Sequence, residues 1–360
     1  MSAVLPTPSG HPPKGTHPNA LGGKSIPPFA HAYRTADETL FQDLVRAGFR
    51  RIVLQTPAGL QRNALELGRT IRERTGADVI HVTRTCFGAC DPPAATEVAG
   101  AEALVTLGHA PIPNMPLALP TYFVEMRTSE GDVEALARKV AEAGLPARLG
   151  VVASIQHLDL VGPLTEALGR RGITLRSAEG DARLAYAAQA LGCNYTTAER
   201  VADEVDGFLF LGTGLFHPLG LAYAVEKPVW SLDPLQTTLA PPLDRDGMVR
   251  RRLLTIARVM DARRWGILVS TFGGQNRMAM AQRLRERARS HQREAEILVF
   301  DRLESRDLLA RDVEAYVSTA CPRIALDDGE LYDRPILTPP EFLSALGERP
   351  LTPYQFDTYH

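Results

Sequence analysis

The sequence has little of what usually assigns a protein to a class at first sight. Its 360 residues contain four cysteines and two tryptophans, and the formal net charge is only -2. The apolar runs are strand-sized and fall far short of the roughly 18 residues that a membrane helix needs. No long block of like charges suggests an interaction tail. We therefore expect neither membrane association nor direct nucleic-acid binding, and any partner must be recognised locally.

Residues 1–32 are rich in proline, glycine and histidine and contain no apolar segment of the kind found in a secretory signal. This composition predicts a flexible leader, and its histidines are more typical of a solvated tail than of a metal site. Without a secretory signal, we expect a cytoplasmic protein whose thiols stay reduced. Cysteines in that setting serve as ligands, as nucleophiles or as buried apolar residues.

From about residue 36 onward, short β-rich runs alternate with amphipathic helical stretches, which predicts an α/β fold. A strand, a polar or glycine-containing loop and a helix recur three times. The three strands are predicted at 51–56, 149–154 and 265–270, the three helices at 60–74, 158–171 and 275–290, and a further strand with its polar turn at 103–109, 207–213 and 315–321. We interpret these repeats as three similar subdomains, each a mainly parallel sheet flanked by helices, over residues 33–147, 148–262 and 263–360.

The polar turns of these repeats follow the carboxyl ends of the predicted strands. Ligands of open parallel sheets bind at that edge. Three such edges that face one another would enclose a central pocket, and we expect the functional site there.

One loop cysteine falls in each predicted subdomain: Cys90, Cys193 and Cys321. Their wide spacing is unlike the close CxxC pairs of zinc fingers. Cys86 and Cys90 match the first half of the CxxxCxxC run of conventional radical S-adenosylmethionine enzymes, but Pro93 occupies the third place. Three thiolates could hold three irons of a 4Fe–4S cube and leave the fourth iron open. The alternative is that the cysteines are small buried apolar residues.

Several short motifs occur in one fixed order around these cysteines. They are Phe-Gly-Ala-Cys-Asp at 87–91, Gly-His at 108–109, Ile-Gln-His at 155–157, Leu-Gly-Cys-Asn at 191–194, Phe-His-Pro-Leu-Gly at 216–220, Asp-Pro at 233–234 and Cys-Pro-Arg-Ile-Ala-Leu-Asp-Asp at 321–328. Each motif is weak alone, but the ordered set resembles the diphthamide synthase family, the 2-(3-amino-3-carboxypropyl)histidine synthases. The resemblance covers about residues 36–345.

The resemblance implies three related α/β domains arranged around a central 4Fe–4S cluster, with Cys90, Cys193 and Cys321 as its ligands. Cys86 is left over. We interpret it as a buried neighbour, because a fourth thiolate would close the open iron. No catalytic residue beyond the cluster ligands is expected.

The activity implied by the resemblance is the first step of diphthamide biosynthesis, a transferase reaction. The reduced cluster gives an electron to S-adenosylmethionine, the bond to the methionine γ-carbon breaks, and the 3-amino-3-carboxypropyl group is added to C2 of a histidine of translation elongation factor 2. The partners implied are elongation factor 2, an unidentified electron donor and a second copy of the chain. Archaeal members act as homodimers and eukaryotic members as heterodimers, and the full cysteine set suits the homodimeric type.

The methionine carboxylate of S-adenosylmethionine needs charge-assisted donors or backbone N–H groups. Our candidates are Arg323 and the loop of Gly273, Gly274 and Gln275, with Gly273 and Gln275 as the proposed contacts. An equally good interpretation of Arg323 is a structural ion pair with Asp327 or Asp328. The glycine loop also fits a tight strand-to-helix turn.

Five more residues are candidates for the S-adenosylmethionine pocket. Gly212, Gly214 and His217 form a motif that lacks the third glycine of a dinucleotide fingerprint, so only the family resemblance supports them. Gln156 follows a predicted strand and could bind a polar ligand edge. Asp233 could bind ribose or cap the turn that begins at Pro234.

Two other classes of function remain open from the residues alone. In a zinc-stabilised scaffold, the three cysteines and either His109 or His217 would form a closed tetrahedral site. A metal-free enzyme that binds a nucleotide or sugar phosphate is also compatible with α/β architecture. Neither alternative explains the ordered motifs.

Overall fold

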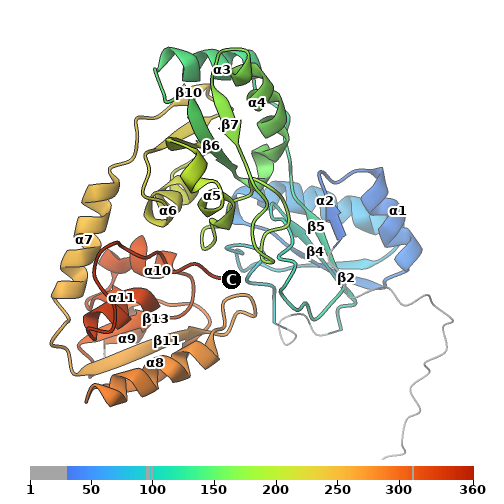
Figure 1. Cartoon of the computed structure of the whole chain (residues 1–360). Helices are drawn as coiled ribbons and strands as arrows, with labels where there is room; N and C mark the ends of the chain where they lie inside the picture. Colours follow the sequence, from blue (N-terminus) through green and yellow to red (C-terminus); the bar gives the residue numbers. More distant parts are fainter. Residues whose placement is uncertain (1–30, 95–97, 99, 310–311) are drawn as a thin grey trace, which may run out of the picture.

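The computed structural model describes residues 31–94, 98, 100–309 and 312–360. The predicted leader at 1–32 therefore lies almost entirely outside the described residues. Successive parts of the chain form three separate sheets, and helices pack on their faces (Figure 1). The predicted α/β class with three mainly parallel sheets is confirmed.

The first sheet has the strand order β1-β5-β4-β2-β3, and all its pairings are parallel. Its strands are β1 (His31–Tyr33), β2 (Arg51–Gln55), β3 (Asp78–His81), β4 (Ala103–Leu107) and β5 (Thr121–Val124), and its helices are α1 (Glu38–Ala47), η1 (Ala58–Leu60) and α2 (Gln61–Thr75).

The second sheet has the order β10-β9-β8-β6-β7, and only its edge strand β10 is antiparallel. Its strands are β6 (Arg148–Ala153), β7 (Thr174–Arg176), β8 (Gly207–Leu211), β9 (Val229–Asp233) and β10 (Thr238–Leu239). The helices of this part of the chain are α3 (Val133–Glu142), η2 (Ile155–Leu160), α4 (Val161–Gly169), α5 (Thr196–Glu199), η3 (Ala202–Glu204) and α6 (Phe216–Ala224).

The third sheet has the order β12-β11-β13-β14 and is parallel throughout. Its strands are β11 (Arg264–Ser270), β12 (Glu294–Phe300), β13 (Ala315–Ser318) and β14 (Ile336–Leu337). The helices of this part are α7 (Arg245–Ala257), α8 (Met278–Ser290), α9 (Ser305–Leu309), α10 (Arg323–Leu326), η4 (Gly329–Leu331) and α11 (Pro339–Ala345).

All three sheets share one arrangement of four strands. In each, the first strand of the repeat lies between the second and the third, and the fourth follows the third: β3-β2-β4-β5, β7-β6-β8-β9 and β12-β11-β13-β14. In open α/β sheets of this order, ligands bind where the connections diverge to opposite sides, between the first and third strands. The common order places one such point on each sheet.

The central strands are buried on both faces and have nearly continuous apolar sequences, as parallel sheets covered by helices require. In β8, for example, Phe208, Leu209, Phe210 and Leu211 are all fully buried. The core of the second sheet also takes in α3, through residues such as Leu136. The boundary at 147 assigned this helix to the first subdomain, and the proposed domain boundaries stay predictions.

The chain crosses from the second to the third sheet through the long helix α7, and its C-terminus returns to the space between the three sheets (Figure 1). Among the described residues, no helix combines the length and apolarity that a membrane crossing requires.

Candidate metal centre

A cavity of about 740 Å³ lies at the meeting point of the three sheets. Its lining comes from loops that follow β3 and β4 of the first sheet, β6, β7 and β8 of the second, and β11, β12 and β13 of the third. These loops all leave the carboxyl ends of parallel strands, where ligand sites of α/β proteins form. The central pocket expected from the sequence is therefore present.

Cys90, Cys193 and Cys321 all line this cavity, and each thiol is partly exposed to it. Cys90 follows β3 and Cys193 follows β7, so these two cysteines occur after the second strand of their repeats. Cys321 instead follows β13, the third strand of its repeat. The three thiols converge although the repeats do not place them at equivalent positions.

The loop of Cys90 is fixed by the buried carboxylate of Asp91. This carboxylate accepts hydrogen bonds from the backbone N–H groups of Phe87 (3.0 Å) and Gly88 (3.2 Å) and pairs with Arg84 (3.1 Å). The side chain of Gln55, at the end of β2, donates to the Asp91 carbonyl (2.8 Å). Since the charge of Asp91 is satisfied within the loop, the residue has a structural role beside the ligand.

The third sheet reaches across the cavity to the same cysteine. The N–H of Gly274 donates to the Cys90 carbonyl (3.0 Å), and Gln275 Nε2 lies 3.2 Å from Cys90 Sγ. A Cβ at position 274 would stand 2.6 Å from Cys90 Cα, so only glycine fits. At Gly273 a Cβ would meet nothing within 4 Å. Of the two glycines in the predicted loop, the one with a structural requirement is thus Gly274.

Cys321 ends the strand-to-helix turn between β13 and α10. Its carbonyl accepts a hydrogen bond from the N–H of Ile324 (3.1 Å), which closes the first turn after the cysteine. Arg277 holds the other side of this cysteine through the carbonyls of Thr319 (2.5 Å) and Ala320 (3.1 Å). The cysteine therefore has little freedom to leave the cavity.

Burial raises the pKa of all three thiols, that of Cys90 to about 12. In Cys193 this rise is opposed by the guanidinium groups of Arg183 and Arg277. Without a metal, these three cysteines consequently favour the neutral thiol form. A bound metal reverses this preference, because a coordinating thiol is deprotonated.

The fourth cysteine has a different setting. Cys86 is 3% exposed, burial raises its pKa to about 12, and its Sγ lies 3.8 Å from Nδ1 of His109. Burial lowers the pKa of His109 and of His217 to about 4, so both imidazoles in the cavity wall are neutral at physiological pH.

Four of the eight residues predicted for the S-adenosylmethionine pocket line the cavity with the cysteines. They are Gln156, His217, Gln275 and Arg323. Gln156 also joins two sheets, because its Nε2 donates to the Gly108 carbonyl (2.8 Å).

The other four, Gly212, Gly214, Gly273 and Asp233, are not among the lining residues. The Asp233 carboxylate accepts hydrogen bonds from the N–H groups of Leu235 (2.9 Å) and Gln236 (3.0 Å). This is the turn cap that the sequence analysis gave as the alternative to ribose binding.

Arg323 is the polar group in the cavity with the greatest unused hydrogen-bonding capacity. It is 3% exposed and stacks on Phe216, with its Cζ 4.4 Å from the ring centroid. Asp327 lies 2.7 Å from Nε and 2.5 Å from Nη2. Neither Nη1 nor Nη2 has a well-formed hydrogen bond within the part of the chain that the structure describes. Both interpretations of Arg323 therefore find support: it forms an ion pair and still has donors for a ligand.

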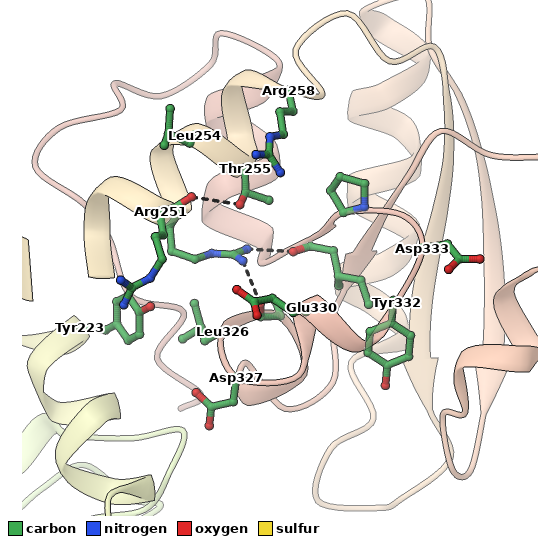
Figure 2. Close-up of a pocket in the computed structure, with 15 residues that line it drawn as sticks. Tyr223, Arg251, Leu254, Thr255, Arg258, Leu326, Asp327, Glu330, Tyr332 and Asp333 are labelled. Atoms are coloured by element: carbon green, nitrogen blue, oxygen red, sulfur yellow. Dashed lines mark hydrogen bonds between the residues drawn. The ribbon is translucent and has the colours of Figure 1, made fainter. Parts of the chain in front are cut away.

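A second cavity, of about 380 Å³, is lined by residues of α7, of α10 and of the segment that follows α10 (Figure 2). The side chain of Arg252 crosses it, and every arm of the guanidinium is used. It donates to the Ala325 and Ile336 carbonyls (2.8 Å each) and pairs with the buried carboxylate of Glu341 (2.7 and 2.8 Å). The contacts of Arg252 in this cavity therefore stabilise the packing around the third sheet.

The zinc alternative has no counterpart in the described ranges, where no group of three or more His, Cys, Asp or Glu side chains is placed to hold a single ion. Thiols that each bind a different iron stand further apart than the ligands of one ion. The donor set of three thiols from three loops fits a cluster with one open iron.

The chain matches the family model described as putative diphthamide synthesis protein over residues 56–356. It is 37% identical over 320 residues to the 2-(3-amino-3-carboxypropyl)histidine synthase of Pyrococcus horikoshii. This match covers 88% of this chain and 91% of that protein. Subunit 1 of the corresponding synthase of Homo sapiens is 28% identical over 325 residues, covering 87% of this chain and 72% of that protein.

Solved structures agree with these sequence relatives. The crystal structure of Dph2 from Pyrococcus horikoshii has a TM-score of 0.82 and 35% identity, and the match covers 91% of this chain and 94% of that one. A crystal structure of the same protein with a 4Fe–4S cluster matches equally well.

The fold and the site together define a three-sheet α/β protein with a thiol-lined central cavity. Within that class, the chain belongs to the diphthamide synthesis family, and the resemblance noted in the sequence is confirmed.

Proposed function

We propose that this chain is a 2-(3-amino-3-carboxypropyl)histidine synthase, the transferase of the first step of diphthamide synthesis. The observation that carries the proposal is the convergence of Cys90, Cys193 and Cys321, one from each sheet, on a single cavity. In a family whose named members are such synthases, these residues are the candidate ligands of a 4Fe–4S cluster. When bound, the cluster would supply the electron that breaks the bond between the sulfonium and the methionine γ-carbon of S-adenosylmethionine.

The protein's own contribution is to bind S-adenosylmethionine in one orientation. Arg323 follows Cys321 by two residues, and its Nη1, which has no hydrogen bond among the described residues, is available to the methionine carboxylate. Its stacking on Phe216 and its pair with Asp327 fix the plane of the guanidinium, so little side-chain freedom is lost on binding. Gln156, His217 and Gln275 are the other proposed contacts in the cavity.

The acceptor would be a histidine of translation elongation factor 2, as in the activity implied by the family. The cavity mouth supports access by a protein segment, since the lining residue Phe87 is 68% exposed. A second copy of the chain and an electron donor complete the proposed system. We place it in the cytoplasm, where unpaired thiols stay reduced.

The test is anaerobic reconstitution with iron and sulfide, reduction with dithionite and addition of S-adenosylmethionine, with methylthioadenosine followed by chromatography. We expect product from the wild type and none from Cys90→Ala, Cys193→Ala or Cys321→Ala. Cys86→Ala is the matched control and should retain both the cluster and the reaction, because its thiol faces His109. Transfer to elongation factor 2 is then measured by mass spectrometry. Equal cleavage by the three variants, or loss only in Cys86→Ala, contradicts the proposed ligand set.

A further inference from the structure

The last residues of the chain are buried in the centre of the molecule, between the three sheets (Figure 1). Phe356 packs edge-to-face on Tyr195, with 5.6 Å between ring centroids, and belongs to the core of the second sheet. Asp357 and Tyr359 are 4% and 8% exposed. Burial of this kind is held by specific contacts with the surrounding loops.

The first set of contacts joins the C-terminus to the loop of Cys193. The N–H of Tyr359 donates to the Cys193 carbonyl (2.8 Å), and Nδ2 of Asn194 donates to the Tyr359 carbonyl (2.9 Å). His360 adds an ion pair with Asp181 (2.8 Å), whose carboxylate also accepts from Asn194. Cys193 and Asn194 are thus both hydrogen-bonded to Tyr359.

The second set of contacts connects the Tyr359 ring with the loop of Cys90. The Cζ of Arg183 lies 4.1 Å from the ring centroid, and Nη2 of the same arginine donates to the Gly274 carbonyl (2.7 Å). Gly274 in turn donates to the Cys90 carbonyl (3.0 Å). Arg183 is 4% exposed, so its position depends on these few partners.

The third set reaches the loop of Cys321. The Cζ of Arg277 lies 4.5 Å from the Tyr359 centroid, and Asp357 holds the same guanidinium through two hydrogen bonds (2.9 and 2.5 Å). The remaining donors of Arg277 bind the carbonyls of Thr319 and Ala320, the two residues before Cys321. Cation–π contacts are stronger when the groups are desolvated, as they are here.

We propose that the C-terminal segment 356–360 fastens the three cysteine loops to one another, with Tyr359 as the positioning residue at the centre of the network. The inference rests on the proposed ligation of a cluster by Cys90, Cys193 and Cys321. Each ligand loop comes from a different sheet, so their mutual spacing depends on contacts between sheets. Tyr359 is joined to the Cys193 loop directly, to the Cys321 loop through Arg277, and to the Cys90 loop through Arg183 and Gly274.

The segment also bears on the electrostatics of the site. It holds two guanidinium groups beside a site that would carry thiolates and a reducible cluster. By keeping them in place, the segment would hold positive charge beside that site as well as fix its geometry.

The experiment compares full-length wild type with Tyr359→Ala, with a chain that ends at Thr358, and with two controls. Tyr359→Phe keeps the ring between the arginines, and Leu351→Ala alters an exposed residue that precedes the segment. After anaerobic reconstitution, the readouts are iron per chain, the rate of cluster loss to a chelator, and the electron paramagnetic resonance signal after dithionite. The melting temperature of the iron-free protein reports the fold separately.

We expect Tyr359→Ala and the shortened chain to lose the cluster to the chelator about 10-fold faster than wild type, the low end of effects seen for groups that orient metal ligands. The two controls should keep the wild-type rate, and the melting temperature of the iron-free proteins should change little. Unchanged cluster retention in both altered chains overturns the inference while leaving the proposed function intact. A wild type that takes up no cluster overturns the proposed function itself.

Discussion

Two buried arginines, Arg252 in α7 and Arg323 in α10, differ in how far the fold satisfies their hydrogen-bond donors. Arg252 faces the smaller cavity and donates to two carbonyls and both oxygens of Glu341. Arg323 faces the cavity of the cysteines and has terminal nitrogens without a well-formed hydrogen bond among the described residues. Both are nearly inaccessible to solvent, at 7% and 3% exposure.

The difference is one of satisfied and unsatisfied donors. Buried polar groups in folded proteins almost always have partners, since an unpaired donor costs about 1–3 kcal/mol. Arg252 meets that requirement within the fold. Arg323 meets it only in part, which is the expected condition of a group whose remaining partner is a ligand.

The largest effect should come from Arg252. Arg252→Met leaves the Glu341 carboxylate buried without its cation, and we expect a loss of about 3–5 kcal/mol in the free energy of unfolding. Urea unfolding of the iron-free protein measures it. Arg251→Met, at the exposed neighbouring position, is the matched control and should change stability little. If both variants unfold at the same urea concentration, Arg252 has no special structural role.

Two histidines in the wall of the larger cavity make the stability of the protein depend on pH. Burial lowers the pKa of His109 and His217 to about 4, whereas an unfolded histidine has a pKa near 6.5. The unfolded chain therefore binds more protons between these values. The stability due to each neutral imidazole is fully present above pH ~6.5 and is lost as the pH falls toward 4, by up to about 3 kcal/mol per histidine.

Urea unfolding of the iron-free protein at pH 7.5 and pH 5 checks this dependence. In His217→Gln, the difference in unfolding free energy between the two pH values should shrink, because one of the two groups no longer titrates. His291→Gln, at a surface position paired with Glu348, serves as the control. A wild type equally stable at both pH values would show that the imidazoles are hydrated and not buried as described.

Arg323 should affect binding and leave stability nearly unchanged. We expect Arg323→Met to weaken S-adenosylmethionine binding by about 10–100-fold, because a charge-assisted, bidentate contact is lost. Equilibrium binding to the reconstituted, unreduced protein measures this, with iron content and melting temperature as checks. Arg323→Lys keeps the charge without the planar guanidinium, and its affinity for S-adenosylmethionine should lie between those of wild type and Arg323→Met. A variant that binds normally but melts early would place Arg323 with Arg252 as a structural residue.

Much of this arrangement could be predicted from the sequence. The strand–loop–helix repeat gave the three sheets because apolar strands at 51–56, 149–154 and 265–270 are strong local signals. The three cysteines could be selected because each lies in a loop within an ordered set of motifs. Local chain properties were sufficient to predict the sheets, and a resemblance built on local motifs was sufficient to select the cysteines.

The network around Tyr359 could not be found in that way. Arg183, Arg277 and Tyr359 carry no motif and act through contacts between segments far apart in the sequence, such as Arg277 with Asp357, 80 residues away. The requirement for glycine at Gly274 likewise arises from the approach of the Cys90 backbone, which belongs to another sheet. Sequence patterns report what a segment does locally, whereas these residues are defined by how the sheets meet.

The smallest effect we predict concerns Gln275, whose Nε2 lies 3.2 Å from Cys90 Sγ. A hydrogen bond to a cluster thiolate favours the reduced, more negative state, so Gln275→Leu should lower the reduction potential. We expect a shift on the order of 60 mV, the one-electron equivalent of a tenfold change. Redox titration followed by electron paramagnetic resonance measures it, with the exposed Gln236→Leu as control. A potential that does not move would mean that Gln275 donates to S-adenosylmethionine instead, and its binding affinity would then fall as it does in Arg323→Met.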